Sequence, residues 1–392
     1  WTDSFPVRLI AVDPFWYEDN QDVKQLPVRS TTNVTGSIYS LKGNKYSLEF
    51  SGGSIGQLQR GIIGPDGGLY IRETGTSIAL WNGTSKSIFV TANNNIHDFS
   101  FGPDGTMYAV GDFTSINGVA ATRVAKRDPI TVVWSAMGTG LNGAGRSVCV
   151  AQNGQVYVGG DFTTAGGVAC LYIARWDGLQ WRTVGSTSGV SNSVYRIIKG
   201  NDTSTLYFGG LFLTSNGGGI TYNCVASINI TTNLISQVGY GFSSPLPGSG
   251  TLNVYDLAVG LDGTLYAGGN FSASGAPGTT TLLCVAQWSG GNLWRPMGNG
   301  LDYTVHTLEI DGDGGVLAGG FFRYSGVESV HKNAKYSGGA WSATYLQAAG
   351  TSTIGSVGEI VRASNGDIYY IITTNTTLQV SIPSYVTITN IG

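Results

Sequence analysis

The sequence predicts an all-β fold, a seven-bladed β-propeller of four-stranded blades, and three observations support this prediction. The chain has 392 residues, and 60 of them are Gly, about twice the average usage. A turn, an aromatic strand and the motif Gly-Gly-x-Phe recur together at intervals of about fifty residues. No segment shows the period of an amphipathic helix. Short strands in a repeated unit of this length are typical of propeller blades.

The composition excludes several classes of protein. Charged residues make up 11% of the chain and the net charge is −3, so a nucleic-acid partner is not expected. Apolar residues make up 41%, which together with the low charge argues against a disordered chain. No apolar run approaches the roughly 18 residues that span a bilayer, so membrane insertion is not expected either. What remains is a Gly-rich β-protein with a polar, uncharged surface.

The repeat has seven copies, and each copy predicts four strands. An alternating strand, an Asp-Gly or Asn-Gly turn and a second strand form a hairpin, because these turns need positive φ at both central residues. A polar loop follows Gly-Gly-x-Phe, and then come a third strand, such as residues 171–176, and a fourth, such as residues 181–185. The anchor position of the second strand holds Tyr70, Tyr108, Tyr157, Tyr207, Tyr266, Leu317 and Tyr369 in successive copies.

The two ends of the repeat region are half-copies. Residues 37–50 resemble a third and a fourth strand with no first pair before them, and residues 357–373 resemble a first and a second strand. We therefore predict that the two halves form one blade, so that strands from both termini close the ring and cover its sheet edges. The chain then divides into an N-terminal arm at 1–35, a propeller at 36–375 and a C-terminal strand at 376–392.

The segments outside the propeller resemble a known family. Residues 5–19, FPVRLIAVDPFWYED, are similar to a segment of the distal tail proteins of long-tailed bacteriophages, and the last ten residues, about 383–392, are similar to the strand that resumes that scaffold. The resemblance implies a propeller inserted in a scaffold that forms a ring at the tail tip. It implies a place in the virion tail, other phage tail proteins as partners and a homo-oligomeric ring.

We expect no catalytic residue, no metal ion and no cofactor. Residues 52–56, GGSIG, match a hydrolase nucleophile pattern, but no helical pattern follows them and that motif needs one. No cysteine spacing indicates zinc. Buried free thiols are predicted for Cys149, Cys170, Cys224 and Cys284.

One position of the repeat is a candidate binding site. Aligning the copies by their turns places His97, Arg146, Tyr195, Tyr255 and His306, with Gln59 and Gly358, at the start of the innermost strand. This position should ring one mouth of the central channel, either as a ligand-binding collar or as a hydrated rim. Asp112, Asp161 and Asn270 precede the Phe of the motif, and we interpret them as caps of the following loops.

Three long loops, residues 213–223, 239–253 and 272–283, should open on the same face as the collar. Loops on a rigid scaffold often carry binding specificity. Tyr222, Tyr240 and Phe242 could stack on sugar rings there, although loop length can also vary without a function.

The sequence is most consistent with a non-enzymatic structural and adhesion module of a phage tail tip. Its loops would bind a host-surface glycan or protein. One alternative is a purely structural tail decoration, and another is a secreted bacterial surface propeller. An enzyme such as a glycosidase would need paired carboxylates roughly 5–10 Å apart, which the collar alignment does not supply.

Overall fold

The computed structural model describes residues 37–42, 45–51, 61–72, 75–82, 85–247, 250–275, 280–344, 356–362 and 368–373. The arms at 1–35 and 376–392 lie outside these residues, and so do the two segments that resemble phage tail proteins. Residues 52–56 and Gln59 lie outside them as well.

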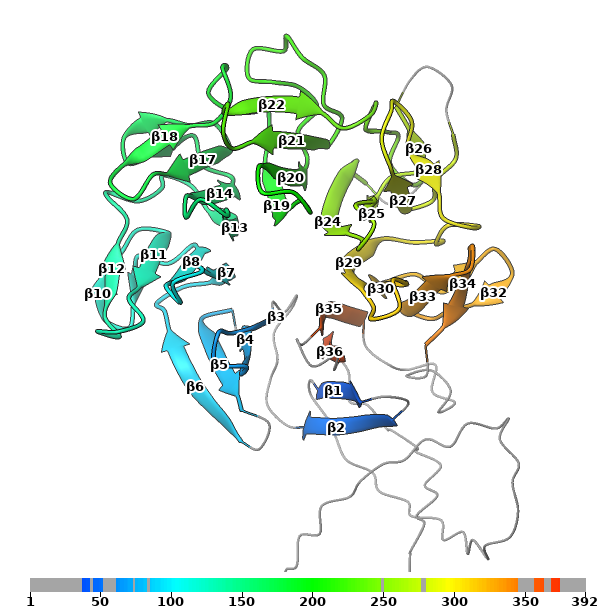
Figure 1. Ribbon diagram of the computed structural model, residues 1–392, viewed down its shortest axis with the longest axis horizontal. Helices are drawn as coiled ribbons and strands as arrows, with labels where there is room; N and C mark the ends of the chain where they lie inside the picture. Colours follow the sequence, from blue (N-terminus) through cyan, green and yellow to red (C-terminus); the bar gives the residue numbers. More distant parts are fainter. Residues whose placement is uncertain are drawn as a thin grey trace, which may run out of the picture.

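The described residues form an all-β propeller of four-stranded antiparallel sheets, arranged radially with β7, β13, β19, β24 and β29 innermost (Figure 1). There are seven such sheets in the described part of the chain. The first three are β3 (Gly61–Ile63), β4 (Leu69–Arg72), β5 (Ser77–Trp81) and β6 (Lys86–Thr91); β7 (Ile96–Phe101), β8 (Met107–Gly111), β11 (Val124–Arg127) and β12 (Trp134–Ala136); and β13 (Gly145–Val150), β14 (Val156–Gly160), β17 (Ile173–Trp176) and β18 (Trp181–Thr183).

The next three sheets repeat the same order from the inside outward. They are β19 (Val194–Lys199), β20 (Thr205–Gly210), β21 (Val225–Asn229) and β22 (Leu234–Gln237); β24 (Asn253–Val259), β25 (Leu265–Asn270), β27 (Val285–Trp288) and β28 (Arg295–Pro296); and β29 (Val305–Ile310), β30 (Val316–Gly320), β33 (Asn333–Ser337) and β34 (Ala340–Ala343). Short ribbons such as β31 (Tyr324–Ser325) with β32 (Glu328–Ser329) lie in the loops after the second strands.

The seventh sheet joins strands from both ends of the chain. It contains β35 (Ser356–Arg362) and β36 (Ile368–Thr373) with β1 (Ser37–Lys42) and β2 (Lys45–Ser51). β1 pairs with β36 in an antiparallel register that sets Ser37 opposite Ile372. The predicted pairing of the two half-copies is therefore confirmed. In addition, β35 contacts both β29 and β3, the inner strands of two other sheets.

The second Gly of Gly-Gly-x-Phe allows two backbones to approach closely. A Cβ on Gly160 would collide with the carbonyl oxygen of Ala144, and a Cβ on Gly269 would collide with that of Asn253. The same clash recurs at the equivalent Gly111, Gly210 and Gly320. The Phe that ends each motif is fully buried. The motif therefore packs the second strand against the start of the first.

The first Gly of the motif makes room for a neighbouring sheet. A Cβ on Gly159, Gly209, Gly268 or Gly319 would lie 2.5–2.8 Å from a valine of the next inner strand. The copy that begins at β7 reverses this arrangement. It has Val110 at the motif position, and the next inner strand has Gly145, whose Cβ would lie 2.7 Å from the Val110 Cβ. Each of these contacts thus pairs one valine with one glycine.

Polar side chains also join neighbouring sheets at the inner strands. Asp98 Oδ2 accepts a hydrogen bond from the Val148 N–H at 2.9 Å, and Asp256 Oδ2 accepts one from the Leu308 N–H at 2.8 Å. Ser147 and Thr307 do the same for Ile197 and Ile360 in the following sheets. These side chains satisfy buried donors at the open edge of each inner strand, which would be costly if left unpaired.

Candidate ligand-binding collar

The residues predicted to ring the channel share one backbone feature. Six inner strands carry a β-bulge, and the extra residue of each bulge is His97, Arg146, Tyr195, Tyr255, His306 or Gly358. A bulge redirects one side chain out of the regular alternation of a strand. The five described side chains are all partly buried. We call these five residues, His97, Arg146, Tyr195, Tyr255 and His306, the collar.

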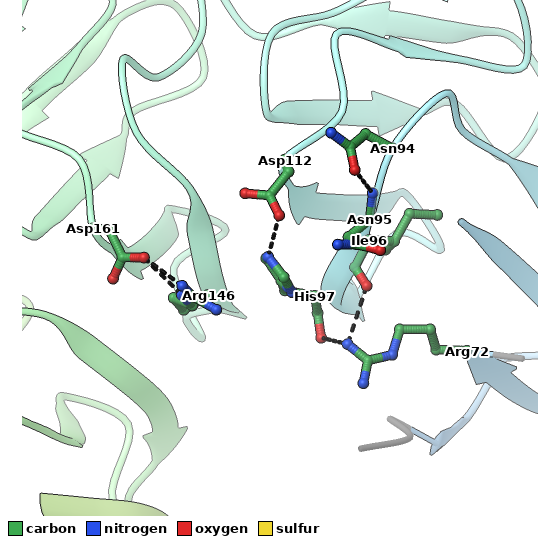
Figure 2. A network of polar contacts seen from close by, with 8 residues as sticks. All are labelled: Arg72, Asn94, Asn95, Ile96, His97, Asp112, Arg146 and Asp161. Carbon is green, nitrogen blue, oxygen red and sulfur yellow. Dashed lines mark hydrogen bonds and ion pairs between the residues drawn. The ribbon is translucent and has the colours of Figure 1, made fainter. Parts of the chain in front are cut away.

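One half of the collar is polar, as Figure 2 shows. The His97 Nε2 lies 2.9 Å from Asp112 Oδ2. The Arg146 guanidinium donates from Nε at 2.8 Å and from Nη2 at 2.6 Å to Asp161 Oδ2. Arg72 Nη1 donates to the carbonyl oxygens of Ile96 and His97, at 3.1 Å each. A side chain of the neighbouring sheet thereby holds the carbonyl groups before and after the His97 Cα.

These contacts correct the interpretation of Asp112 and Asp161 as loop caps. Their carboxylates bind collar side chains, and other residues cap the loops. Asn93 Oδ1 accepts from the Thr114 and Ser115 N–H groups at 2.9 Å each. Asn142 caps the loop of the next copy in the same way. Asn270 differs again, because its amide donates to the Thr251 carbonyl and is buried.

The charges of the polar half nearly cancel. Burial lowers the pKa of His97, and the nearby Asp112 carboxylate offsets this only in part, so the imidazole is neutral at pH 7. Burial alone would also lower the pKa of Arg146, but the hydrogen bond to Asp161 and the charges of Asp161 and Asp112 together outweigh burial and raise it. Arg72 and Arg146 then supply two positive charges against the two carboxylates of Asp112 and Asp161, and this balance does not favour an anionic ligand.

The other half of the collar is aromatic. Tyr195 and Tyr255 stack with ring centroids 5.9 Å apart and planes 6° apart. Tyr255 and His306 stack at 5.1 Å and 16°, and His306 meets Phe321 edge to face at 4.7 Å. Burial lowers the pKa of His306 to about 4, so this ring is also neutral at pH 7. These partly buried rings form an apolar arc beside the polar half.

The loop aromatics do not join this site. Tyr222 is 2% exposed and packs against Phe212, and Phe242 is 1% exposed and stacks on Phe271 at 4.0 Å. Because a ring inside the core has no free face, we remove Tyr222 and Phe242 from the candidate ligand-binding residues. Tyr240 is partly buried, and its hydroxyl accepts a hydrogen bond from Asn292 Nδ2 at 3.3 Å.

Two features of the inner surface were missed by the sequence analysis. Carboxylates follow the collar position on the same strands: Asp256 pairs with Arg196 at 2.6 Å, and Glu309 lies near Asp256 and Glu359. Within the described ranges, no group of three or more His, Cys, Asp or Glu residues could hold a metal ion. The second feature is Phe321, which occupies the variable position of Gly-Gly-x-Phe in the copy that ends at Phe322 and is exposed.

The cysteines of the chain are not reactive groups. Cys149, Cys170, Cys224 and Cys284 are all free and buried, as predicted. Burial raises the pKa of Cys170 to about 11 and that of Cys224 to about 12, which disfavours the reactive thiolate. Among the residues that the structure describes, no helix is long and apolar enough to span a membrane.

Comparison with protein families supports the fold. Residues 102–126 and 151–176 match a family described as a β-propeller domain of unknown function (DUF5122). These segments cover β8 with most of β11 in one sheet and β14 with β17 in the next, so the match is local. No curated protein matches the chain.

Solved structures share the fold at low sequence identity. The extracellular domain of a protein from B. thetaiotaomicron, described as a one component system, is 13% identical with a TM-score of 0.55. That match covers 91% of this chain and 40% of the other, so the chain spans about two fifths of that relative. The WD40 β-propeller domain of Doa1 matches at 13% identity and a TM-score of 0.52, over 87% of this chain and 98% of that one.

A virginiamycin B lyase from Staphylococcus aureus, in a catalytically inactive form with Quinupristin, is also similar. It matches at 13% identity and a TM-score of 0.50, over 90% of this chain and 99% of that one. At such identities these likenesses establish the β-propeller fold alone.

Proposed function

We propose that this chain is a non-enzymatic, extracellular binding module, a closed seven-bladed propeller whose collar binds a carbohydrate. The observation that carries the proposal is the recurrence of one bulge in six inner strands, which gathers the collar side chains at one end of those strands. Bulges are common beside binding sites because they bend the strand locally and thereby redirect a side chain.

A closed ring is supported by the sheet that unites the two ends of the chain. Strands β1 and β36 pair there, and β35 touches inner strands of two other sheets. A closed ring would cover the edges that β1 and β36 would each leave free, and it would hold the collar rigidly. Rigid placement matters because it reduces the entropy that is lost when a ligand binds.

The chemistry of the collar favours a neutral sugar. A pyranose has an apolar face that stacks on aromatic rings and hydroxyl groups that bind planar polar side chains. The aromatic arc of Tyr195, Tyr255 and His306 and the pairs His97–Asp112 and Arg146–Asp161 supply both. The near balance of charge disfavours acidic polysaccharides.

The test is a glycan array probed with the wild-type chain and with the variants Tyr255→Ala and Arg146→Ala. We expect binding to neutral glycans by the wild type and a loss of at least about tenfold in affinity in each variant. Leu261→Ala is the matched control, because Leu261 is 71% exposed in the β24–β25 turn, at the other end of the strand from Tyr255. No binding by the wild type, or equal binding by all three variants, would contradict the proposal. The module would then be a purely structural decoration.

A second candidate function is that of a domain inserted in a phage tail scaffold, and the pairing of β1 with β36 favours it. Since β1 and β36 pair, the propeller begins and ends side by side, as a domain inserted in a scaffold must. A phage tail tip, indicated by residues 5–19 and 383–392, would be such a scaffold. The chain would then lie in the virion tail and assemble into a ring with other tail proteins. Immunogold labelling of tail tips would support this candidate, whereas labelling of a bacterial surface would favour a secreted bacterial propeller.

A further inference from the structure

Three exposed aromatic side chains lie in the segments next to β29 and β30, and one of them contacts the collar residue His306. Phe321 is 48% exposed, Tyr324 is 45% exposed and Tyr303 is 43% exposed. We call Tyr303, Phe321 and Tyr324 the aromatic platform. Large exposed rings on one surface are uncommon in a protein that has no use for them, because they favour association with other molecules.

The propeller fold does not require these rings. The residue equivalent to Phe321 is Asp112, Asp161, Leu211 or Asn270 in the other copies of the motif. The residue equivalent to Tyr324 is Ser115, Thr164, Thr214 or Ala273, and the one equivalent to Tyr303 is Asn94, Gly143, Asn192 or Leu252. All these residues occupy the same place in the same fold. Three aromatic replacements in one copy therefore point to something outside the chain.

The backbone holds the platform in place. The Phe321 N–H donates to the Thr304 carbonyl at 3.0 Å, directly after Tyr303. The Asp302 N–H donates to the Tyr324 carbonyl at 3.0 Å, and Asp302 Oδ1 accepts from the Tyr324 N–H at 2.9 Å. These bonds join the backbone segments that carry the three residues. Little further ordering of the backbone is needed when a ligand binds.

The platform continues the collar and is bordered by polar groups. The Phe321 ring meets His306 edge to face at 4.7 Å, so the aromatic arc extends outward from the inner strand. Exposed side chains of Asp302, Arg323 and Glu328 lie next to the rings in sequence. Aromatic faces among hydrogen-bonding groups suit a sugar chain better than the continuous apolar surface typical of a protein partner.

We propose that the aromatic platform binds successive sugar rings of a linear, neutral oligosaccharide whose end reaches the collar. The proposal rests on the proposed function, since it extends the same site outward. It predicts that affinity depends on chain length, because a short ligand fills the collar alone and a longer one also covers Phe321 and Tyr324.

The experiment is isothermal titration of the chain with malto-, cello- and chito-oligosaccharides, from the disaccharide to the hexasaccharide. Each platform residue is replaced by the residue of another copy, as in Tyr303→Asn, Phe321→Leu and Tyr324→Thr, so the fold tolerates the change. We expect the wild type to bind one series with affinity that rises at least about tenfold with length. The triple variant should lose the gain with length. The double variant Tyr303→Asn and Tyr324→Thr leaves the Phe321 ring beside His306 in place, and it should keep the affinity for the disaccharide.

Two controls separate the possible results. Phe321→Tyr should keep the binding of the hexasaccharide, because it keeps an aromatic face, and Leu261→Ala should change nothing. If affinity is independent of length and the triple variant binds normally, while Tyr255→Ala does not bind, the platform proposal fails and the collar proposal stands. If no oligosaccharide binds the wild type at millimolar concentration, both proposals fail.

Discussion

At the scale of single residues, a small exchange between two copies shows how tightly the sheets pack. Four contacts between sheets set a glycine of the second strand against a valine of the next inner strand. The contact between the β7 and β13 sheets reverses the two residues, with Val110 facing Gly145. The contact has room for the branched side chain of one partner only, and protein interiors have few voids that could take a second.

This exchange predicts a specific pattern of stability in a double-mutant cycle. Gly145→Val would place two valines in one space, and we expect it to lower the free energy of unfolding by about 1–3 kcal/mol. Val110→Gly would leave a cavity and a flexible backbone and should also destabilise the fold. The double variant would recreate the arrangement of the other copies and should recover most of the loss. Urea unfolding measures all four proteins, and strictly additive effects would contradict this account.

A second prediction at this scale concerns Glu309 and pH. Burial, together with the carboxylates of Asp256 and Glu359, raises the pKa of Glu309 from 4.5 to about 7. Between these pH values the folded chain holds a proton that the unfolded chain releases, so this group makes the fold less stable as pH rises from 4.5 to 7. We expect Glu309→Gln to weaken that decline and to stabilise the fold more at pH 8 than at pH 4. Urea unfolding across this pH range measures the effect. If the stability of the variant depends on pH as that of the wild type does, the prediction is wrong.

At the scale of strands, the inner strands are joined by side chains that accept backbone N–H groups of the next sheet. Asp256 of β24 accepts from Leu257 and Leu308 and pairs with Arg196 of β19. One carboxylate therefore links three consecutive inner strands. Arg196 holds in β19 the position that Asp98, Ser147 and Thr307 hold in their strands, but a guanidinium only donates and cannot accept the Leu257 N–H. Asp256 therefore accepts the N–H of its own neighbour Leu257.

Removing this carboxylate should weaken the joints between sheets. Asp256→Ala leaves a buried guanidinium and a buried N–H without their acceptor, and we expect a loss of about 3–5 kcal/mol in the free energy of unfolding. Asp262→Ala is the matched control, because Asp262 is exposed in the turn at the other end of β24 and caps only Thr264. Equal losses in the two variants, measured by thermal unfolding, would show that Asp256 has no special role.

At the scale of the whole molecule, one sheet contains strands from both ends of the chain and joins these ends to each other. Ser37 lies opposite Ile372, so the first and last described strands run beside each other. If the ring is closed, the chain could begin and end at another point of the ring. The strands could be joined by a short linker and the chain opened elsewhere without loss of contacts.

A circular permutant tests this idea. We expect a chain joined between residues 373 and 37 and opened at Ile130, which is 90% exposed, to keep the thermal stability of the same region without permutation. Deleting residues 37–51 instead would uncover the edge of β36 and should cause aggregation, seen by size-exclusion chromatography. A stable, monomeric deletion variant would contradict the importance of the shared sheet.

The sequence alone determined the features that depend on local chemistry. Turn dipeptides, alternating strands and Gly-Gly-x-Phe repeat along the chain, and this repetition was enough to predict the β-propeller, its four-stranded units, the pairing of the two half-copies and the equivalence of the collar positions. These signals are local because turn geometry and strand alternation depend on neighbouring residues.

The tertiary structure decided which side chains are exposed and which groups meet. Tyr222 and Phe242 lie in long loops, yet they are buried, because their rings fill space against Phe212 and Phe271 of the motif. Asp112 and Asp161 bind the collar because bulges bring His97 and Arg146 to them across the sheet. Such burial and pairing depend on contacts between residues far apart in the chain, and a pattern of neighbours does not record them.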